Sequence, residues 1–216
     1  MKITILCTSE GHPVNAFIHR WMDSRRGQHE VTLLRTCRDL QGGDLLFLVS
    51  CGEIVTASDR AKFSKTLVLH ASDLPQGRGW NPHIWQILAG ATHLTVTLLE
   101  AEDKVDTGAI WHQLTIAIDK AALWNEINDT LFTAEMKLLD HAVDRLATVV
   151  PQPQRRGVDP SYHRLRNPSD SRIDPSGTIA EQFDLLRVCD PQRYPAFFDL
   201  HGCRYKITLE KIDDGK

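Results

Sequence analysis

Two side chains in this sequence are of types that move protons together. His70 opens the stretch "HASDLP" (70–75), directly after the apolar run "TLVL", so it stands where a buried strand is expected to end. Asp106 lies in a later acidic turn, "EAEDKVDTGAI" (100–110). Open parallel sheets bind ligands beyond the carboxyl ends of their strands, which is where both residues are expected.

A histidine beside a carboxylate suits acyl-type transfer. The imidazole can accept a proton from an attacking amine, while the carboxylate fixes its tautomer and stabilises its charged form. Spacing alone leaves a plainer alternative open. His70 would then be a structural residue at a strand end, and "VDTG" (105–108) an ordinary turn in which Asp and Gly serve the turn geometry.

The elements that would position this pair follow from the apolar pattern. Runs without clean alternation predict parallel strands covered on both faces, and these are "KITIL" (2–6), "VTLLR" (31–35), "DLLFLVS" (44–50) and "TLVLH" (66–70). Helical spacing and a closing glycine predict helices at 14–27 and 80–90, and further strands follow at 94–100 and 109–118. The alternation predicts an α/β, doubly wound, mostly parallel sheet with helices on both faces.

The second half of the chain begins with a helical stripe over 121–147, for which Asp119 is the expected N-cap. "PQPQ" (151–154) ends that helix, because proline cannot continue it. We therefore expect a main domain at 1–150 and a small α+β extension at 151–216. The extension contains an arginine-rich loop and is predicted to end in a helix at 178–189 and a strand at 203–212.

Composition narrows the class of partner. The chain has 28 acidic and 25 basic residues, a formal net charge of -3, so it carries no footprint for general nucleic-acid binding and a small ligand is the expected partner. No apolar stretch is long enough to span a bilayer, and we expect a soluble, cytoplasmic protein. The 5 cysteines form no C-x-x-C pair and no tight histidine spacing occurs, so we predict reduced thiols and no metal.

The loop sequences resemble the signature of the folate-dependent formyltransferases. "HASDLPQGRGWNP" matches the family's H-x-S-x-L-P loop with the R-G that follows it, and "ILAGATHLTVTLLEAEDKVDTGAI" matches the strand and acidic D-x-G loop after it. The resemblance covers residues 66 to 112 in order. It implies a Rossmann-like formyltransferase fold, 10-formyltetrahydrofolate as the donor, and His70 and Asp106 as catalytic residues.

One position departs from the family pattern. The family has N-x-H, in which the asparagine helps to polarise the formyl oxygen, whereas this chain has Val68 two residues before His70. Removing one oxyanion donor typically costs about two to three orders of magnitude in rate, so another group is expected to act. Asn81 is the candidate, and an N-cap or turn role before Pro82 stays open for it.

A subgroup is more similar still. "GRGWNPHIWQILAGAT", "EAEDKVDTGAIW" and "DLLRVCDPQRYPAFFDLHGCRYKI" resemble the sugar N-formyltransferases of pseudaminic-acid and surface-polysaccharide pathways. The resemblance implies transfer to the amine of a nucleotide-linked, UDP-type 4-amino-dideoxy sugar. Three alternatives stay open: an enzyme like methionyl-tRNA formyltransferase, a 10-formyltetrahydrofolate hydrolase, and a non-catalytic folate or nucleotide-binding module. A homodimer is left open as well.

The resemblance also implies binding residues. The folate pocket maps, largely through backbone atoms, onto Ser50, Cys51, Gly52, Ile54, Glu102, Asp103, Lys104, Val105 and Asp106. Cys51 is interpreted as pocket lining, because formyl transfer from folate to an amine needs no thiol intermediate. Candidate contacts for the acceptor are Ser72, Arg78, Gly79, Trp80, Tyr162, Arg164 and Arg166, since arginine pairs with phosphate and tryptophan stacks on flat rings. For Trp80, packing at a helix start is the alternative.

Overall fold

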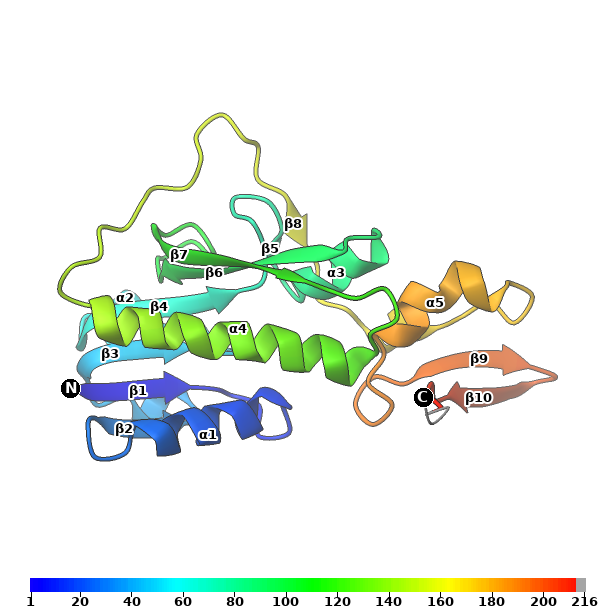
Figure 1. The fold of residues 1–216 in the computed structure, drawn as a ribbon, viewed down its shortest axis with the longest axis horizontal. Coiled ribbons are helices and arrows are strands. Elements are labelled where there is room, and N and C mark those ends of the chain that lie inside the picture. Colours follow the sequence, from blue (N-terminus) through cyan, green and yellow to red (C-terminus); the bar gives the residue numbers. More distant parts are fainter. Residues whose placement is uncertain (213–216) are drawn as a thin grey trace.

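A six-stranded sheet forms the centre of the computed structural model, which describes residues 1–212 (Figure 1). Its order is β2-β1-β3-β4-β6-β7. The strands are β1 (Lys2–Leu6), β2 (Glu30–Leu34), β3 (Gly43–Leu48), β4 (Phe63–His70), β6 (His93–Glu100) and β7 (Ile110–Ala117). The first four pair in parallel, whereas β6 runs antiparallel to both β4 and β7. The predicted α/β fold is confirmed, with a mixed and mostly parallel sheet.

Both faces of the sheet are covered at its centre. Helices α1 (Val14–Arg25) and α4 (Trp124–Arg145) cover one face, where α4 runs roughly along the strands (Figure 1). The opposite face packs against the connections before and after β3, which hold two short helices, η1 (Cys37–Asp39) and α2 (Ala57–Arg60). Because the central strands β1, β3 and β4 are covered on both faces, they carry the uninterrupted apolar runs seen in the sequence.

Helix boundaries correct one expectation. α4 is a single helix that starts at Trp124, three positions later than the stripe suggested. Asp119 is not its N-cap: the Asp119 carboxylate accepts the N–H of Ala121 at 2.7 Å, in the turn before the helix. Glu126 serves the helix start instead, by accepting the N–H of Leu123 at 2.8 Å. The side chain of Glu126, in the first turn of α4, thus satisfies the backbone N–H of Leu123, which precedes the helix.

The chain after α4 contains more strand than the sequence indicated. Its elements are β8 (Tyr162–His163), η2 (Pro168–Ser171), α5 (Ile179–Arg187), β9 (Ala196–Leu200) and β10 (Cys203–Ile207). β9 and β10 form an antiparallel hairpin, so the predicted last strand is shorter and has an unexpected partner. The missed signal was the "HG" loop, since His201 and Gly202 both have positive φ, as a tight two-residue hairpin turn requires.

The extension is fastened to the main body by a buried arginine. Arg187 on α5 is 2% exposed and donates from Nη1 to the carbonyls of Asp119 and Ala122, while Nε binds Asp184. These contacts give Arg187 a structural role. The division into 1–150 and 151–216 stays a prediction. No helix within residues 1–212 is long and apolar enough to cross a membrane.

Candidate active site

His70 and Asp106 come together at the carboxyl end of β4. His70 is the last residue of that strand, and its Nδ1 lies 3.7 Å from Oδ1 of Asp106. Both residues are buried, with 7% and 8% of their surfaces exposed. Burial strengthens the interaction between an imidazolium and a carboxylate, because little water screens the two charges. The pairing that the sequence suggested is therefore present in the structure.

One loop holds both side chains. His70 Nε2 is 2.8 Å from the carbonyl of Gly77, and the N–H of Gly79 donates to Asp106 Oδ2 at 2.8 Å. A carbonyl only accepts, so Nε2 carries a proton and Nδ1 of the neutral ring offers its lone pair beside Asp106. A proton taken up at Nδ1 would face the carboxylate directly. The arrangement can therefore act as a base whose charged form is stabilised on the spot.

The 77–79 loop is fixed by the C-terminal extension. β5 (Arg78–Gly79) pairs in parallel with β8, and the N–H of Trp80 donates to the carbonyl of His163 at 3.0 Å. Gly79 has a φ of +93°, and a Cβ there would lie 2.4 Å from the same carbonyl. Only glycine fits at this close approach. The extension thus helps to set where the Asp106 carboxylate is held.

The two segments predicted to form the folate pocket are tied to each other. Arg60 on α2 donates to the carbonyl of Val55 at 2.8 Å and pairs with Asp103 in the acidic turn. Ile54 and Val105, one in each segment, are 74% and 53% exposed. Exposed apolar side chains on two joined loops offer contact area for a flat ligand. Of the predicted pocket residues, Ser50 and Asp106 have positive φ and Gly52 donates its N–H to Thr8.

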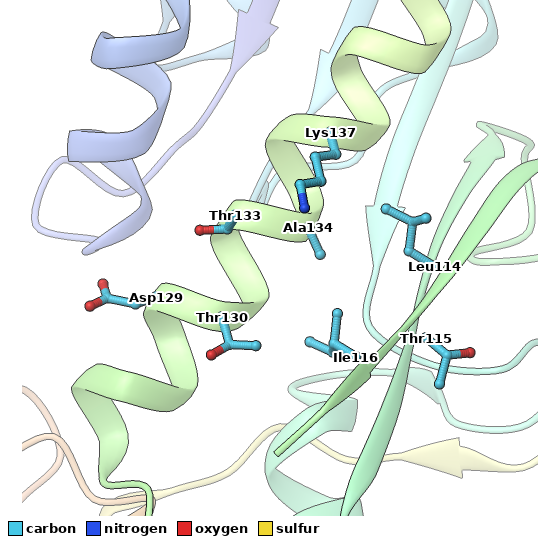
Figure 2. A pocket seen from close by; sticks show the side chains of 8 residues that line it. All are labelled: Leu114, Thr115, Ile116, Asp129, Thr130, Thr133, Ala134 and Lys137. Carbon is cyan, nitrogen blue, oxygen red and sulfur yellow. The ribbon is translucent and has the colours of Figure 1, made fainter. Parts of the chain in front are cut away.

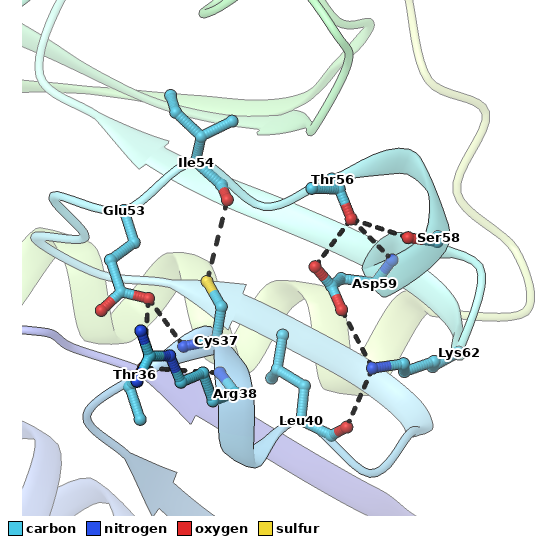
Figure 3. A network of polar contacts seen from close by, with 10 residues as sticks. All are labelled: Thr36, Cys37, Arg38, Leu40, Glu53, Ile54, Thr56, Ser58, Asp59 and Lys62. Carbon is cyan, nitrogen blue, oxygen red and sulfur yellow. Dashed lines mark hydrogen bonds and ion pairs between the residues drawn. The ribbon is translucent and has the colours of Figure 1, made fainter.

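A polar network anchors the 50–56 loop from its other side (Figure 3). Glu53 accepts the N–H of Cys37 at 2.7 Å, which joins this loop to η1. Thr56 and Asp59 bind each other, and Lys62 connects Asp59 to the carbonyl of Leu40 (Figure 3). These hydrogen bonds therefore hold the loop after β3 in place.

The cysteines near this loop are poor nucleophiles. Burial raises the pKa of the Cys51 thiol, and burial together with the Glu53 carboxylate raises the pKa of Cys37 to about 12. The thiolate is the reactive form, so a raised pKa keeps both groups inert at neutral pH. This agrees with the interpretation of Cys51 as pocket lining.

Two of the predicted acceptor contacts, Arg78 and Ser72, are buried. Arg78 is 8% exposed, and its guanidinium donates to Gln154 at 2.6 Å and to the Tyr162 hydroxyl at 3.1 Å. Both Nη atoms thus bind neighbouring protein groups, whereas Nε is buried without a partner among the described residues, and contact with a diphosphate stays a prediction. Ser72 is 1% exposed and its hydroxyl lies out of reach of solvent. Sequence spacing could not reveal this burial, because it depends on how the extension crosses the loop.

The remaining predicted acceptor contacts differ in how exposed their side chains are and in whether those side chains already bind protein groups. Trp80 is 45% exposed, and its ring tip lies 4.0 Å from where a Cβ of Gly52 would stand, so its indole faces the predicted folate loop. Tyr162 is 55% exposed. Arg164 pairs with Asp170 through both carboxylate oxygens, and Arg166 donates to the carbonyl of that same aspartate. Both arginines are therefore already engaged.

Asn81 has the turn role that the sequence left open. It precedes α3 (Pro82–Leu88) with a left-handed backbone, φ +48°, and its side chain makes no capping hydrogen bond. Asparagine tolerates this conformation better than most residues. Val68 lies on the same face of β4 as His70 and packs against the apolar cluster around Leu46 and Val55. The carboxamide of Asn81 is thus available, and the side chain at 68 is apolar.

Two histidines near the site were missed. His12 follows β1, and its Nε2 is 3.4 Å from the Ser50 hydroxyl; burial, then Arg193, lowers its pKa to about 4. His83 lies in the first turn of α3, where burial, then the charges of His12 and His70, lowers its pKa to about 3. Both rings are neutral at pH 7. The strand-end rule that selected His70 would also have selected His12.

Two grooves lie elsewhere on the protein. A groove of about 470 Å³ runs between β7 and α4, where Ile116, Thr130 and Lys137 point into it (Figure 2). A second, of about 570 Å³, lies between α1 and α4 and is lined by Phe17 and Trp124 among others. Neither is lined by a residue of the His70 or Asp106 loops. These grooves therefore do not coincide with the His70–Asp106 site, which is identified by the chemistry of its side chains.

The family follows from comparison of the sequence. A model of the formyl transferase family matches residues 5–143, which include both members of the buried pair. The chain belongs to this family. It is 29% identical over 147 residues to methionyl-tRNA formyltransferase from Dinoroseobacter shibae, a match that covers 68% of this chain. That match spans 48% of the relative, so about half of its length has a counterpart here.

Solved structures share the formyltransferase fold. Methionyl-tRNA formyltransferase from Clostridium thermocellum superposes with a TM-score of 0.83 at 19% identity, covering 100% of this chain and 95% of that one. HypX from Aquifex aeolicus in complex with tetrahydrofolic acid gives 0.81 at 20% identity, covering 97% and 37%. A sugar N-formyltransferase from a Shewanella species gives 0.72 at 16% identity, covering 99% of each chain.

Proposed function

We propose that this formyl transferase family member moves the formyl group of 10-formyltetrahydrofolate to the amine of a nucleotide-linked, UDP-type 4-amino-dideoxy sugar, as in pseudaminic-acid or surface-polysaccharide biosynthesis. The observation that carries the proposal is the buried His70–Asp106 pair beside the two joined loops. In this role His70 Nδ1 takes the proton of the attacking amine, and Asp106 stabilises the imidazolium. The amine nitrogen bonds to the formyl carbon, the C–N bond to tetrahydrofolate breaks, and the proton held by His70 passes to the departing nitrogen.

The folate part of the proposal has a structural counterpart in a relative. HypX from Aquifex aeolicus, which shares the fold, was solved with tetrahydrofolic acid bound. In this chain we assign the pterin to the loops after β3 and around 102–106, where Ile54 and Val105 supply exposed apolar contact. Trp80 then closes the site from the side of Gly52.

A small acceptor fits the charges better than tRNA does. The net charge is -3, and several arginines of the extension are already paired with aspartates, in the ion pairs Arg155–Asp73, Arg164–Asp170, Arg172–Asp199 and Arg204–Asp199. Binding of a nucleic acid relies on arginines and lysines that neutralise many phosphates. The match to methionyl-tRNA formyltransferase keeps formylation of a charged tRNA as the second candidate.

Mass spectrometry tests the proposal. The protein is incubated with 10-formyltetrahydrofolate and a UDP-4-amino-dideoxy sugar, next to His70→Ala, a reaction without sugar and a reaction with methionyl-tRNA. We expect the sugar to gain one formyl group only with intact His70. Folate consumed equally without sugar would make the protein a hydrolase, and formylated methionyl-tRNA would reverse the choice of acceptor. Folate binding without any reaction would leave a binding module.

A further inference from the structure

One glutamine in the segment after α4 reaches the catalytic turn. Gln154 is half-buried, whereas its neighbours 152, 153 and 155–160 are exposed. Its amide nitrogen donates to the carbonyl of Asp106 at 2.8 Å and to the carbonyl of Gly108 at 3.0 Å. Its amide oxygen accepts from Arg78 Nη2 at 2.6 Å. Both ends of the carboxamide are thus used, a pattern that an exposed linker residue would not need.

The two hydrogen bonds donated by Gln154 hold a stretch of backbone that is strained at Asp106. Asp106 has a φ of +56°, a left-handed conformation that costs a non-glycine residue roughly 1 to 2 kcal/mol. Two residues later, a Cβ on Gly108 would lie 1.9 Å from the carbonyl of Glu100, so the turn is pressed against the end of β6. Gln154 holds the carbonyls of residues 106 and 108 by hydrogen bonds. The direction of the Asp106 carboxylate follows from this backbone conformation.

The hydrogen bond that the Gln154 amide oxygen accepts from Arg78 joins the turn at 106–108 to the loop at 77–79, where the Gly77 carbonyl contacts His70. Arg78 lies in β5, between Gly77, which binds His70, and Gly79, which binds Asp106. Through Arg78, the amide of Gln154 connects the two loops whose spacing sets the distance between His70 and Asp106. No other side chain within residues 1–212 hydrogen-bonds both the carbonyl of Asp106 and the guanidinium of Arg78.

We propose that Gln154 is a positioning residue that holds Asp106 against His70. The inference rests on the proposed function insofar as Asp106 serves the base. Gln154 itself touches no reacting atom. Its effect passes through the carbonyl of Asp106 and through Arg78, so its loss should lower turnover while substrate binding persists.

Two substitutions separate the two ends of the amide. Gln154→Glu keeps the size and the bond from Arg78 but cannot donate to the carbonyls of Asp106 and Gly108. Gln154→Ala removes both ends. Gln152→Glu is the matched control, because the Gln152 side chain binds only the carbonyl of Val150 in its own segment. Should Gln154→Ala fold poorly, Gln154→Glu still decides the question.

The first readout needs no substrate. The N–H of Gly79 binds the Asp106 carboxylate, so its hydrogen-exchange protection, measured by NMR, reports where that carboxylate stands. We expect both Gln154 variants to lose protection at Gly79 by roughly 10-fold, as the loss of about one hydrogen bond predicts. Gln152→Glu should stay within about twofold.

The second readout is turnover. We expect kcat to fall by roughly 10- to 100-fold in both Gln154 variants, the cost of a small misplacement, with KM for folate nearly unchanged. Unchanged Gly79 protection together with wild-type kcat would overturn the inference. If the unsubstituted chain transfers no formyl group at all, the proposed function fails, and the Gly79 measurement still judges the role of Gln154 by itself.

Discussion

His70 and Asp106 are each hydrogen-bonded to the same short loop, at Gly77 and Gly79, while Nδ1 of His70 and Oδ1 of Asp106 lie 3.7 Å apart. The loop rather than a direct hydrogen bond therefore sets the geometry of the pair. In the proposed reaction, the amine would meet an imidazole nitrogen that already faces a carboxylate. Changes to the loop and changes to the pair should consequently affect turnover in similar ways.

Asp106→Asn should separate charge from shape. The amide oxygen can still accept the N–H of Gly79, so the turn should keep its conformation, but the imidazolium loses its counter-charge. We expect kcat for formyl transfer to fall by roughly 10²- to 10⁴-fold, the usual range for losing acid–base catalysis. Asp23→Asn, at a surface aspartate paired with Arg26, is the control. Equal activity of the two variants would remove Asp106 from the mechanism.

Gly79→Ala tests the contact between β5 and β8. The new methyl group would collide with the carbonyl of His163 and would sit at a φ of +93°. Gly157→Ala is the matched control, since Gly157 has a φ of +76° and nothing within 4 Å. In urea titrations we expect Gly157→Ala to lose about 1 kcal/mol from backbone strain and Gly79→Ala to lose about 3 kcal/mol. Similar losses would mean that the collision relaxes easily.

Asn81→Gly tests whether that residue replaces the missing family asparagine. Glycine keeps the left-handed backbone at φ +48° and removes only the carboxamide. If the carboxamide polarises the formyl oxygen, kcat should fall by roughly 10²- to 10³-fold, with thermal stability nearly unchanged. We expect that loss in steady-state kinetics. A variant as fast as the parent would show that Asn81 serves only the turn. The neutral imidazoles of His12 and His83 would then be the next candidates for polarising the formyl oxygen.

Glu135 should make stability depend on pH. It lies within α4, 7% exposed, with Oε2 unpartnered, and burial raises its pKa from 4.5 to about 8. The folded chain therefore keeps a proton that the unfolded chain releases, so this stabilisation is complete below pH 4.5 and is lost as the pH rises through about 8. Between these values the unfolding free energy should fall by about 1 kcal/mol per pH unit.

Glu135→Gln should remove that slope, because the amide stays neutral at every pH. Urea titrations at pH 5, 6.5 and 8 would compare the parent chain, Glu135→Gln and the surface control Glu30→Gln. The variant should be more stable than the parent at pH 8. Identical slopes for all three chains would show that Glu135 ionises without penalty in the folded state.

The local pattern of the sequence was enough for the main sheet. The runs at 2–6, 31–35, 44–50 and 66–70 all became strands, because burial of both faces demands apolar residues that can be read in order. The strand-end rule placed His70 correctly, and the acidic loop placed Asp106. The prediction that Asp119 caps α4 was wrong. The Asp119 carboxylate binds the N–H of Ala121 before the helix, and Glu126, inside the helix, accepts the N–H of Leu123 at the helix start.

The sequence by itself thus determined the strands, the family resemblance and the two members of the buried His70–Asp106 pair, since each is encoded in a contiguous stretch. Only the tertiary structure decided what holds that pair. β5 and β8 are two residues long and carry no periodicity, and Arg78 meets its partners Gln154 and Tyr162 far along the chain. Such contacts depend on the path of an irregular segment across the sheet edge, and no local preference specifies that path.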